Sequence, residues 1–419
     1  MILLRLTWFS LLNRKSTLLL TILSISLSVV LLLGVDMVRH QAKEGFSSTV
    51  SGTDLIVGAR SGQINLLLYS VFRIGNATNN ISWQSYQAIS QHPKVKWSIP
   101  LSLGDSHKGY RVLGTNTDYF KHYRYGKKQP LTFRQGQQFN SLYDVVLGAE
   151  VANKLGYEIG DKIVIAHGAG NVALVEHDDK PFSVVGILAP TGTPVDNTLH
   201  VSLQAIEAIH VDWKSGMKLP GVNISAEQAA LLELQPKQIT AFMLGLHSKL
   251  STFHLQRSIN QYRKEPLLAI LPGLTLQELW QMFGLMEKAL LLVSALVAVS
   301  SLIGLLTLML TSLNERRREM AILRSVGARP LHIFLLLMFE SLLITFLSIA
   351  LGVVLFYALL IAVAPVLQSE FGLLLYPQVL TLWQWQLLGI LFFVGSIVGL
   401  IPGYRAYKNS LVDGMAIRV

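Results

Sequence analysis

Four stretches of the chain lack charged residues and are long enough to cross a lipid bilayer. They cover residues 16–35, 289–313, 341–369 and 371–404. A membrane-spanning helix needs about 20 predominantly apolar residues, so each stretch predicts one span. The predicted helices cover 16–38 for the first span, 275–313 for the second span with a stalk, 331–365 for the third span and 383–403 for the fourth span. A short loop at 366–382 is predicted to connect the third and fourth spans.

Residues 39–274, between the first two spans, show a different pattern. Short runs rich in Val, Ile and Leu are bounded by Gly, Pro or Asn, which is typical of strands; they cover 54–57, 110–113, 162–166, 182–188, 198–201, 239–246 and 267–271. Helix-like segments lie at 83–91, 150–155, 202–210 and 252–263, with Ser202 as an N-cap of the third. The predicted fold class is an α-helical membrane protein with four transmembrane helices and a large α+β domain between helices 1 and 2.

The second span is predicted to extend beyond the membrane. Thr275 and Glu278 form a capping-box pattern, and apolar residues recur every three or four positions from there to Leu290. A helix over 275–313 would be about 58 Å long at 1.5 Å per residue, nearly twice the hydrocarbon thickness of about 30 Å. We therefore expect a stalk, although two helices broken near Gly284 remain an alternative.

Composition supports the membrane interpretation. Only 14% of the residues are charged and 51% are hydrophobic, whereas a soluble domain carries about 25% charged residues. The chain has no cysteine, which excludes disulfides, thiolate metal sites and a cysteine nucleophile.

The distribution of Lys and Arg predicts the orientation. Three lie in residues 1–15, five in 314–330 and three in 404–419, whereas 39–288 hold 24 in 250 residues. Positive charge concentrates on the cytoplasmic side of membrane proteins. We therefore predict a cytoplasmic amphipathic helix at 1–15, a cytoplasmic loop at 314–330, a cytoplasmic tail at 404–419, and an outside, periplasmic location for 39–274. The net charge of +10 thus indicates topology and contact with membrane lipid, and we predict no nucleic acid partner.

The loop at 314–330 has the most specific pattern. Its first half is charged, and its second half carries an apolar stripe of Met320, Ile322, Leu323 and Val326. Gly327 is a helix stop and Pro330 can begin the next helix. On composition alone, this pattern favours an anchor that touches only lipid headgroups.

Residues 315–328 resemble the signature that follows the second span in FtsX-like permeases, the MacB and lipoprotein-release type of ABC transporter subunit. Glu340 stands where that family has an acidic residue in its third span. Residues 150–156 and 160–162 are similar to a motif of the family's outside domain, and 411–418 resemble its closing motif with departures at nearly every position.

The resemblance implies that the loop docks on a cytoplasmic ABC ATPase subunit. The residues that it assigns to this coupling are Glu315, Arg316, Arg317, Arg318, Glu319, Met320, Leu323, Arg324 and Gly327, with Glu340 coupling within the membrane. It also implies a bacterial inner membrane, a second permease subunit in a homo- or heterodimer, and a possible periplasmic or outer-membrane partner. Because no G-x-x-x-x-G-K-[ST] motif occurs, we expect a non-catalytic chain without a cofactor, and ATP and Mg²⁺ bound by a separate partner.

The resemblance predicts a permease subunit that moves or extrudes lipoprotein, peptide or other hydrophobic cargo. The alternative is an FtsX-like mechanotransmitter that regulates a periplasmic hydrolase and transports nothing. A membrane-anchored enzyme is disfavoured, since neither G-x-S-x-G nor H-E-x-x-H is present.

Polar residues elsewhere in the chain could bind a metal ion or lie at the membrane surface. His167, His177 and Asp178 could ligate zinc, but their spacing fits a hairpin turn as well, and we predict no metal site. Asp36, at the end of the first span, is expected to be interfacial and solvated.

Overall fold

The computed structural model describes residues 15–49, 51–168, 175–176, 178–214, 217–218, 224–315, 320, 322, 325–371 and 377–408. The chain divides into two compact units. The helical unit comprises Met1–Gln41, Gly284–Val366 and Leu375–Val419. The α/β unit comprises Ala42–Phe283 and Leu367–Leu374.

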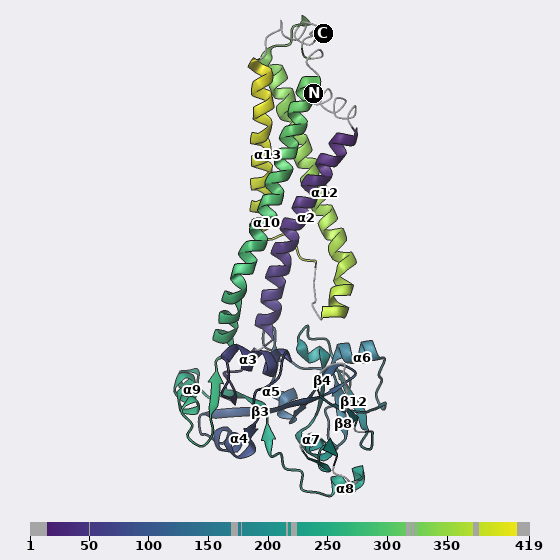
Figure 1. Ribbon diagram of the computed structural model, residues 1–419, viewed down its shortest axis with the longest axis vertical. Helices are drawn as coiled ribbons and strands as arrows, with labels where there is room; N and C mark the ends of the chain where they lie inside the picture. The colour runs from purple at the N-terminus through teal and green to yellow at the C-terminus, as the bar shows by residue number, and fades with distance from the viewer. Residues whose placement is uncertain are drawn as a thin grey trace. The chain divides into compact units, whose positions relative to one another are not determined.

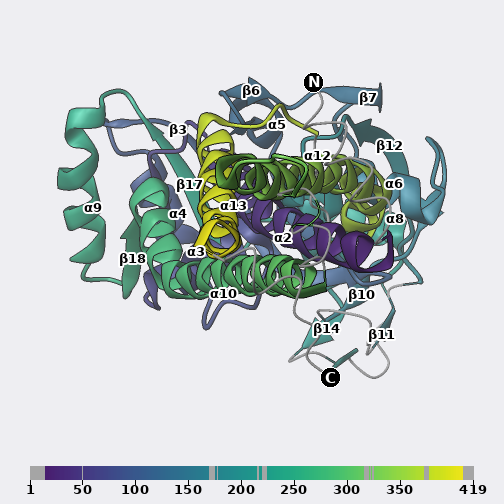
Figure 2. The same ribbon diagram turned by 90° about the horizontal axis from the view of Figure 1, so that it is seen from above.

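Four long helices build the helical unit and lie side by side (Figures 1 and 2). They are α2 (Lys15–Ser48), α10 (Pro272–Glu315), α12 (Pro330–Phe371) and α13 (Leu382–Lys408). By length and composition each can cross a membrane, over Lys15–Gln41, Pro272–Leu313, Pro330–Ala364 and Leu382–Ala406. Their packed interior consists of apolar side chains from all four helices, among them Ile25, Leu305, Ile344 and Leu391.

Helix α10 differs from the prediction at its start. It begins at Pro272, three residues before the predicted cap. The N–H of Thr275 already donates to the carbonyl of Leu271 at 3.0 Å, so Thr275 lies inside the first turn and the predicted capping box is wrong. Proline fixes φ at a helical value and lacks an N–H that the first turn would leave unpaired. The helix runs unbroken through Gly284, so the broken alternative is wrong too, and 44 residues give about 66 Å.

The α/β unit is built on one mixed sheet of 12 strands, in the order β18-β1-β17-β3-β4-β13-β8-β12-β7, with β9, β10 and β11 paired beside this path. Its strands are β1 (Leu55–Ala59), β3 (Val95–His107), β4 (Tyr110–Thr115), β7 (Phe133–Gly136), β8 (Asp144–Leu147), β9 (Lys162–Ile163), β10 (Ala166–His167), β11 (Val175–Glu176), β12 (Phe182–Leu188), β13 (Thr198–Ser202), β17 (Ala241–Leu246) and β18 (Leu267–Ile270). The pairs β12–β8 and β13–β4 are parallel, and the other pairs are antiparallel. Short pairs form between β2 (Ile81–Ser82) and β16 (Gln238–Ile239), β5 (Arg124–Tyr125) and β6 (Gln129–Pro130), and β14 (Trp213–Lys214) and β15 (Met217–Lys218).

Short helices complete this unit. They are α3 (Gln63–Leu67), α4 (Trp83–Ser90), α5 (Asp118–His122), α6 (Ala149–Leu155), α7 (Leu203–Ile209), α8 (Ala226–Ala230) and α9 (Thr252–Asn260), with the single turns η1 (Leu68–Phe72), η2 (Pro194–Asn197) and η3 (Lys249–Ser251). The predicted N-cap Ser202 is confirmed, because its hydroxyl accepts from the N–H of Ala205 at 3.0 Å. The predicted fold class, four membrane-length helices with an α+β domain between the first two, is confirmed.

Candidate functional site

Hydroxyl groups hold the helices of the helical unit together. The hydroxyls of Ser28 on α2 and Ser301 on α10 lie 2.7 Å apart, and Ser24 contacts the same Ser301 at 3.1 Å. Ser26 donates to the carbonyl of Ser348 on α12 at 2.9 Å. Lipid offers no alternative hydrogen-bond partner, so serine pairs of this kind favour association of membrane helices. They connect α2 to both α10 and α12.

Helix α13 packs on α12 through glycines spaced four residues apart. A Cβ atom on Gly399 would lie 2.5 Å from Cβ of Ser341, and one on Gly395 would lie 2.7 Å from Oγ1 of Thr345. The Ser341 hydroxyl donates to the carbonyl of Gly395 at 2.9 Å. Small residues at this spacing let two membrane helices approach closely. This contact fixes the part of α12 that carries Glu340.

Glu340 is buried between helices, with 5% of its surface exposed. It lines a cavity of about 10 Å³ together with Thr17 of α2, Met309 and Ser312 of α10, and three apolar side chains. A cavity of this size is at the limit for one water molecule. The Ser312 hydroxyl is buried and has no hydrogen-bond partner among the residues that the structure describes. A carboxyl group within a membrane span is costly to bury and marks a functional position by default.

Arg5, Arg14 and Arg324, basic residues that could pair with Glu340 near the cytoplasmic face, lie outside the described residues. Glu340 therefore stays a predicted coupling residue, now placed where α2, α10 and α12 meet.

Asp36 is not a solvated interfacial residue, contrary to the sequence interpretation. It is buried, with 5% of its surface exposed, and Oδ2 accepts a hydrogen bond from Nε2 of Gln384 on α13 at 3.0 Å. Arg39, one turn along α2, lies 3.8 Å from its other oxygen and also pairs with Glu287 of α10. The four side chains link α2, α10 and α13. No local pattern around Asp36 predicts this contact with Gln384, because 348 positions separate the two residues.

Most of the predicted coupling loop lies outside the described residues, namely Arg316, Arg317, Arg318, Glu319, Leu323 and Arg324, whereas Glu315 ends α10. Met320 is 8% exposed and packs with Leu313 of α10, Ile333 and Leu337 of α12, and Ala406 of α13. This cluster joins the loop to three helices.

The end of the loop has the predicted geometry. Gly327 adopts φ of +101°, a left-handed conformation that glycine accepts without steric cost at a helix end. Helix α12 then begins at Pro330. Ile322 and Val326 are exposed, Val326 to 83%, so the predicted apolar stripe divides into one buried methionine and two exposed side chains.

The weak metal candidate lies partly outside the residues that the structure describes. His167 lies in β10 and Asp178 in an exposed turn, and His177 falls outside the described residues. No group of three His, Asp or Glu able to hold a metal ion occurs among the described residues.

The motif at 150–162 has a structural explanation. Gly156 ends α6 in the left-handed conformation, with φ of +68°, and Gly160 has φ of +98°. Oδ2 of Asp161 accepts from the N–H of Glu158 at 2.8 Å and so closes the turn between them. The glycines and the aspartate of this motif shape a turn.

The α/β unit buries ionisable groups that sequence reasoning missed. Lys180 and Asp212 are fully buried, and Nζ of Lys180 lies 3.0 Å from Oδ1 of Asp212. Burial lowers the pKa of His200 to about 3, so this histidine is neutral at pH 7. Burial also lowers the pKa of His210, but the nearby Asp105 carboxylate outweighs it, and the net shift is upward. No local pattern around these residues signals their burial.

Comparisons with known proteins cover both units. Residues 18–240, more than half of the chain, match the model of the MacB-like periplasmic core domain, and residues 291–411 match the FtsX-like permease C-terminal model. The macrolide export ATP-binding/permease protein MacB of Chromobacterium violaceum is 33% identical over 134 residues, which cover 31% of this chain and 20% of that protein. The protein of the same name from Salmonella paratyphi A is 24% identical over 368 residues, which cover 84% of this chain and 51% of that protein.

The chain thus spans about half the length, or less, of these curated relatives. The crystal structure of the periplasmic region of MacB from Actinobacillus actinomycetemcomitans covers 55% of this chain and 94% of its own, at 11% identity and a TM-score of 0.35. Together the family matches and the four membrane-length helices indicate a multi-pass protein of the inner membrane. The chain belongs to the MacB and FtsX-like family of ABC transporter permeases.

Proposed function

We propose that this chain is a permease subunit that transmits ATP-driven motion of a separate cytoplasmic ATPase to its α/β unit in the periplasm, and so moves or extrudes lipoprotein, peptide or other hydrophobic cargo. The observation that carries the proposal is the continuity of α10. This helix follows strand β18 directly and continues without a break to Glu315, where the loop begins. A single helix of this length resists bending, so displacement at one end is passed to the other.

The loop offers a surface for the ATPase. Met320 anchors it to α10, α12 and α13, while Ile322 and Val326 remain exposed. Three consecutive arginines, at positions 316–318, precede this apolar pair in the sequence. A surface that combines apolar side chains with positive charge suits a protein partner with an acidic rim. Two such chains, each with four spans, would bind two ATPases in a dimer.

Charge reversal of Arg316, Arg317 and Arg318 to glutamate should release the ATPase. The reversed charges would repel a surface that is complementary to the native ones. Co-purification of the ATPase with the full chain, in detergent, measures the effect. Reversal of Arg405 and Lys408, basic residues of the last turn of α13, is the control and should leave binding unchanged. Retention of the ATPase by the triple variant would refute the docking surface.

Glu340→Gln should lower stimulated ATP hydrolysis several-fold and leave assembly intact. Glutamine keeps the size of the side chain but removes its charge at the meeting point of three helices. Glu278→Gln, an exposed position on α10, serves as the control. Unchanged stimulation in Glu340→Gln would show that this carboxyl has no coupling role.

Mass spectrometry of the material that stays bound to the purified complex separates the two functions that the family permits. Recovery of lipoprotein, peptide or lipid supports transport. Recovery of a periplasmic hydrolase without such cargo supports the regulatory alternative.

A further inference from the structure

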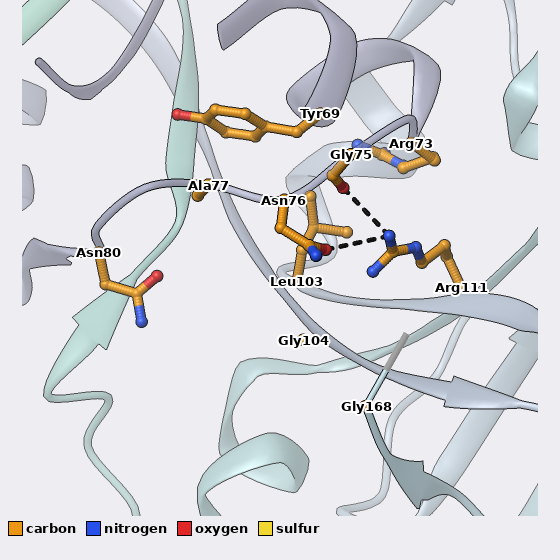
Figure 3. A pocket seen from close by; sticks show the side chains of 10 residues that line it. All are labelled: Tyr69, Arg73, Gly75, Asn76, Ala77, Asn80, Leu103, Gly104, Arg111 and Gly168. Atoms are coloured by element: carbon orange, nitrogen blue, oxygen red, sulfur yellow. Dashed lines mark hydrogen bonds between the residues drawn. The ribbon is translucent and has the colours of Figure 1, made fainter. Parts of the chain in front are cut away.

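The α/β unit contains a cavity of about 250 Å³ that the transport proposal does not use. Tyr69 and Arg73, from the segment around η1, form one side. Leu103 and Gly104 of β3 and Arg111 of β4 form another, and Asn76 and Asn80 complete it (Figure 3). The described lining contains two guanidinium groups and no carboxylate.

Arg111 is half-buried in this cavity. One of its nitrogens donates to the carbonyl of Gly75 and to Oδ1 of Asn76, both at 3.0 Å (Figure 3). These acceptors orient the guanidinium but are uncharged, and they leave its other N–H groups available. Burial, together with the positive charge of Arg73, lowers the pKa of Arg111.

Arg73 sits in an unusual backbone conformation. It follows the π-helical turn η1 and has φ of +60°, in the left-handed region that side chains other than glycine rarely adopt. One terminal nitrogen donates to the carbonyl of Ser70. Its Nε is buried and has no hydrogen-bond partner among the described residues. Single π-turns and strained residues both concentrate at functional sites.

The sheet is also irregular at this cavity. Leu103 pairs with Leu113, and Ser106 pairs with Arg111, so β3 has one residue more than β4 between the two pairs. Gly104 lies in this bulge, and a Cβ atom built on it would meet nothing within 4 Å. Bulges redirect side chains and are frequent beside binding sites. Here the bulge opens the floor of the cavity next to Arg111.

Neither arginine forms an ion pair with a side chain that the structure describes. Two partly desolvated positive charges without a counter-ion among the described side chains are costly, and a ligand that neutralises them would be favoured.

We propose that this cavity binds a phosphoryl group, with Arg73 and Arg111 as the two guanidinium ligands and the amides of Asn76 and Asn80 as further hydrogen-bond donors. A dianion balances two guanidinium charges, and the planar fork of arginine suits phosphate oxygens. The group can belong to a free phosphate compound or to the headgroup of an anionic lipid. The site is independent of ATPase docking, since all its residues lie in the α/β unit.

Calorimetric titration of the full chain in lipid nanodiscs tests the proposal. The probes are inorganic phosphate, the short-chain lipid dihexanoyl phosphatidic acid, and dihexanoyl phosphatidylcholine, which carries no net charge. Binding of phosphate and phosphatidic acid indicates a site for any phosphoryl group. Binding of phosphatidic acid alone indicates a lipid headgroup. Both results support the proposal. The proposal is overturned if neither inorganic phosphate nor phosphatidic acid binds, or if phosphatidylcholine binds as tightly as phosphatidic acid.

Arg111→Gln should weaken binding of the probe that binds the wild-type chain by about 10- to 100-fold. This is the range expected for the loss of one hydrogen bond between charged groups. Arg134→Gln is the matched control, because Arg134 also donates to an asparagine oxygen, Oδ1 of Asn153 at 2.9 Å, but is exposed. Should Arg111→Gln fail to fold, Asn80→Ala at an exposed lining position should still weaken binding several-fold. If Arg111→Gln folds and binds the probe with wild-type affinity, the proposed phosphoryl site is refuted. If Arg111→Gln does not fold, wild-type affinity of Asn80→Ala refutes it.

Discussion

Replacing Lys180 with methionine should lower the free energy of unfolding of the α/β unit by about 3–5 kcal/mol. Nζ of Lys180 lies 3.0 Å from Oδ1 of Asp212 and 3.1 Å from Oδ2 of Asp179. Lys180 and Asp212 are both fully buried. Methionine fills a similar volume but removes the cation that lies 3.0 Å from the buried Asp212 carboxylate. Hydrogen exchange of peptides from the α/β unit, measured on the full chain, reports the loss.

Two controls show whether the cost arises from loss of the Lys180–Asp212 ion pair. Lys162→Met removes an exposed lysine whose Nζ donates to the Ser183 hydroxyl at 2.6 Å, and it should cost less than about 1 kcal/mol. The double variant Lys180→Met with Asp212→Leu removes both charges and should recover most of the lost stability. A loss of less than about 1 kcal/mol in Lys180→Met alone would contradict the buried pair.

Lys180 also illustrates which part of the structure the sequence does not predict. It follows His177, Asp178 and Asp179 in a polar stretch that is typical of an exposed turn. Its buried partner Asp212 lies 32 residues further along, and no local pattern specifies that pairing. The same holds for Asp36, whose burial depends on Gln384 of the last helix.

A strand with a dense apolar run was predicted well, whereas a strand interrupted by proline and glycine was missed. The predicted strand 182–188 coincides with β12, since five of its seven residues are large apolar side chains and the run lies between a proline and an Ala-Pro pair. The longest strand, β3, was not predicted. It contains Pro100, which cannot donate to a neighbouring strand, and Gly104 at the bulge. Both residues are unfavourable in a central strand, yet β3 pairs with β17 on one side and with β4 on the other.

The candidate site was predicted where the signal is local. Gly327 and Pro330 mark a helix end and a helix start through their own backbone preferences, and Glu340 is conspicuous as a carboxylate in an apolar run. The cavity between Arg73 and Arg111 was not predicted. Its two arginines are 38 positions apart and meet only because β4 pairs with β3 beside the turn η1.

Gly399→Leu should separate α13 from α12 and abolish most of the ATPase stimulation. Even the Cβ atom would lie 2.5 Å from Cβ of Ser341, and neither atom can rotate away. Overpacking of this kind costs about 1–3 kcal/mol or more. Because Ser341 directly follows Glu340, displacement of α12 also moves this side chain away from the cavity that it lines with residues of α2 and α10. Thermal unfolding of the solubilised chain and stimulated ATP hydrolysis measure the two consequences.

Gly389→Leu on the same helix is the matched control. A Cβ atom at Gly389 meets nothing within 4 Å, so leucine there adds the same volume and the same helix propensity without a clash. Comparison of the two variants therefore isolates helix packing from the intrinsic effect of replacing glycine. If both variants unfold at the same temperature and support equal ATPase stimulation, the close approach of α12 and α13 has no part in coupling. If only Gly399→Leu loses stability and ATPase stimulation, the close approach of these two helices is required for coupling.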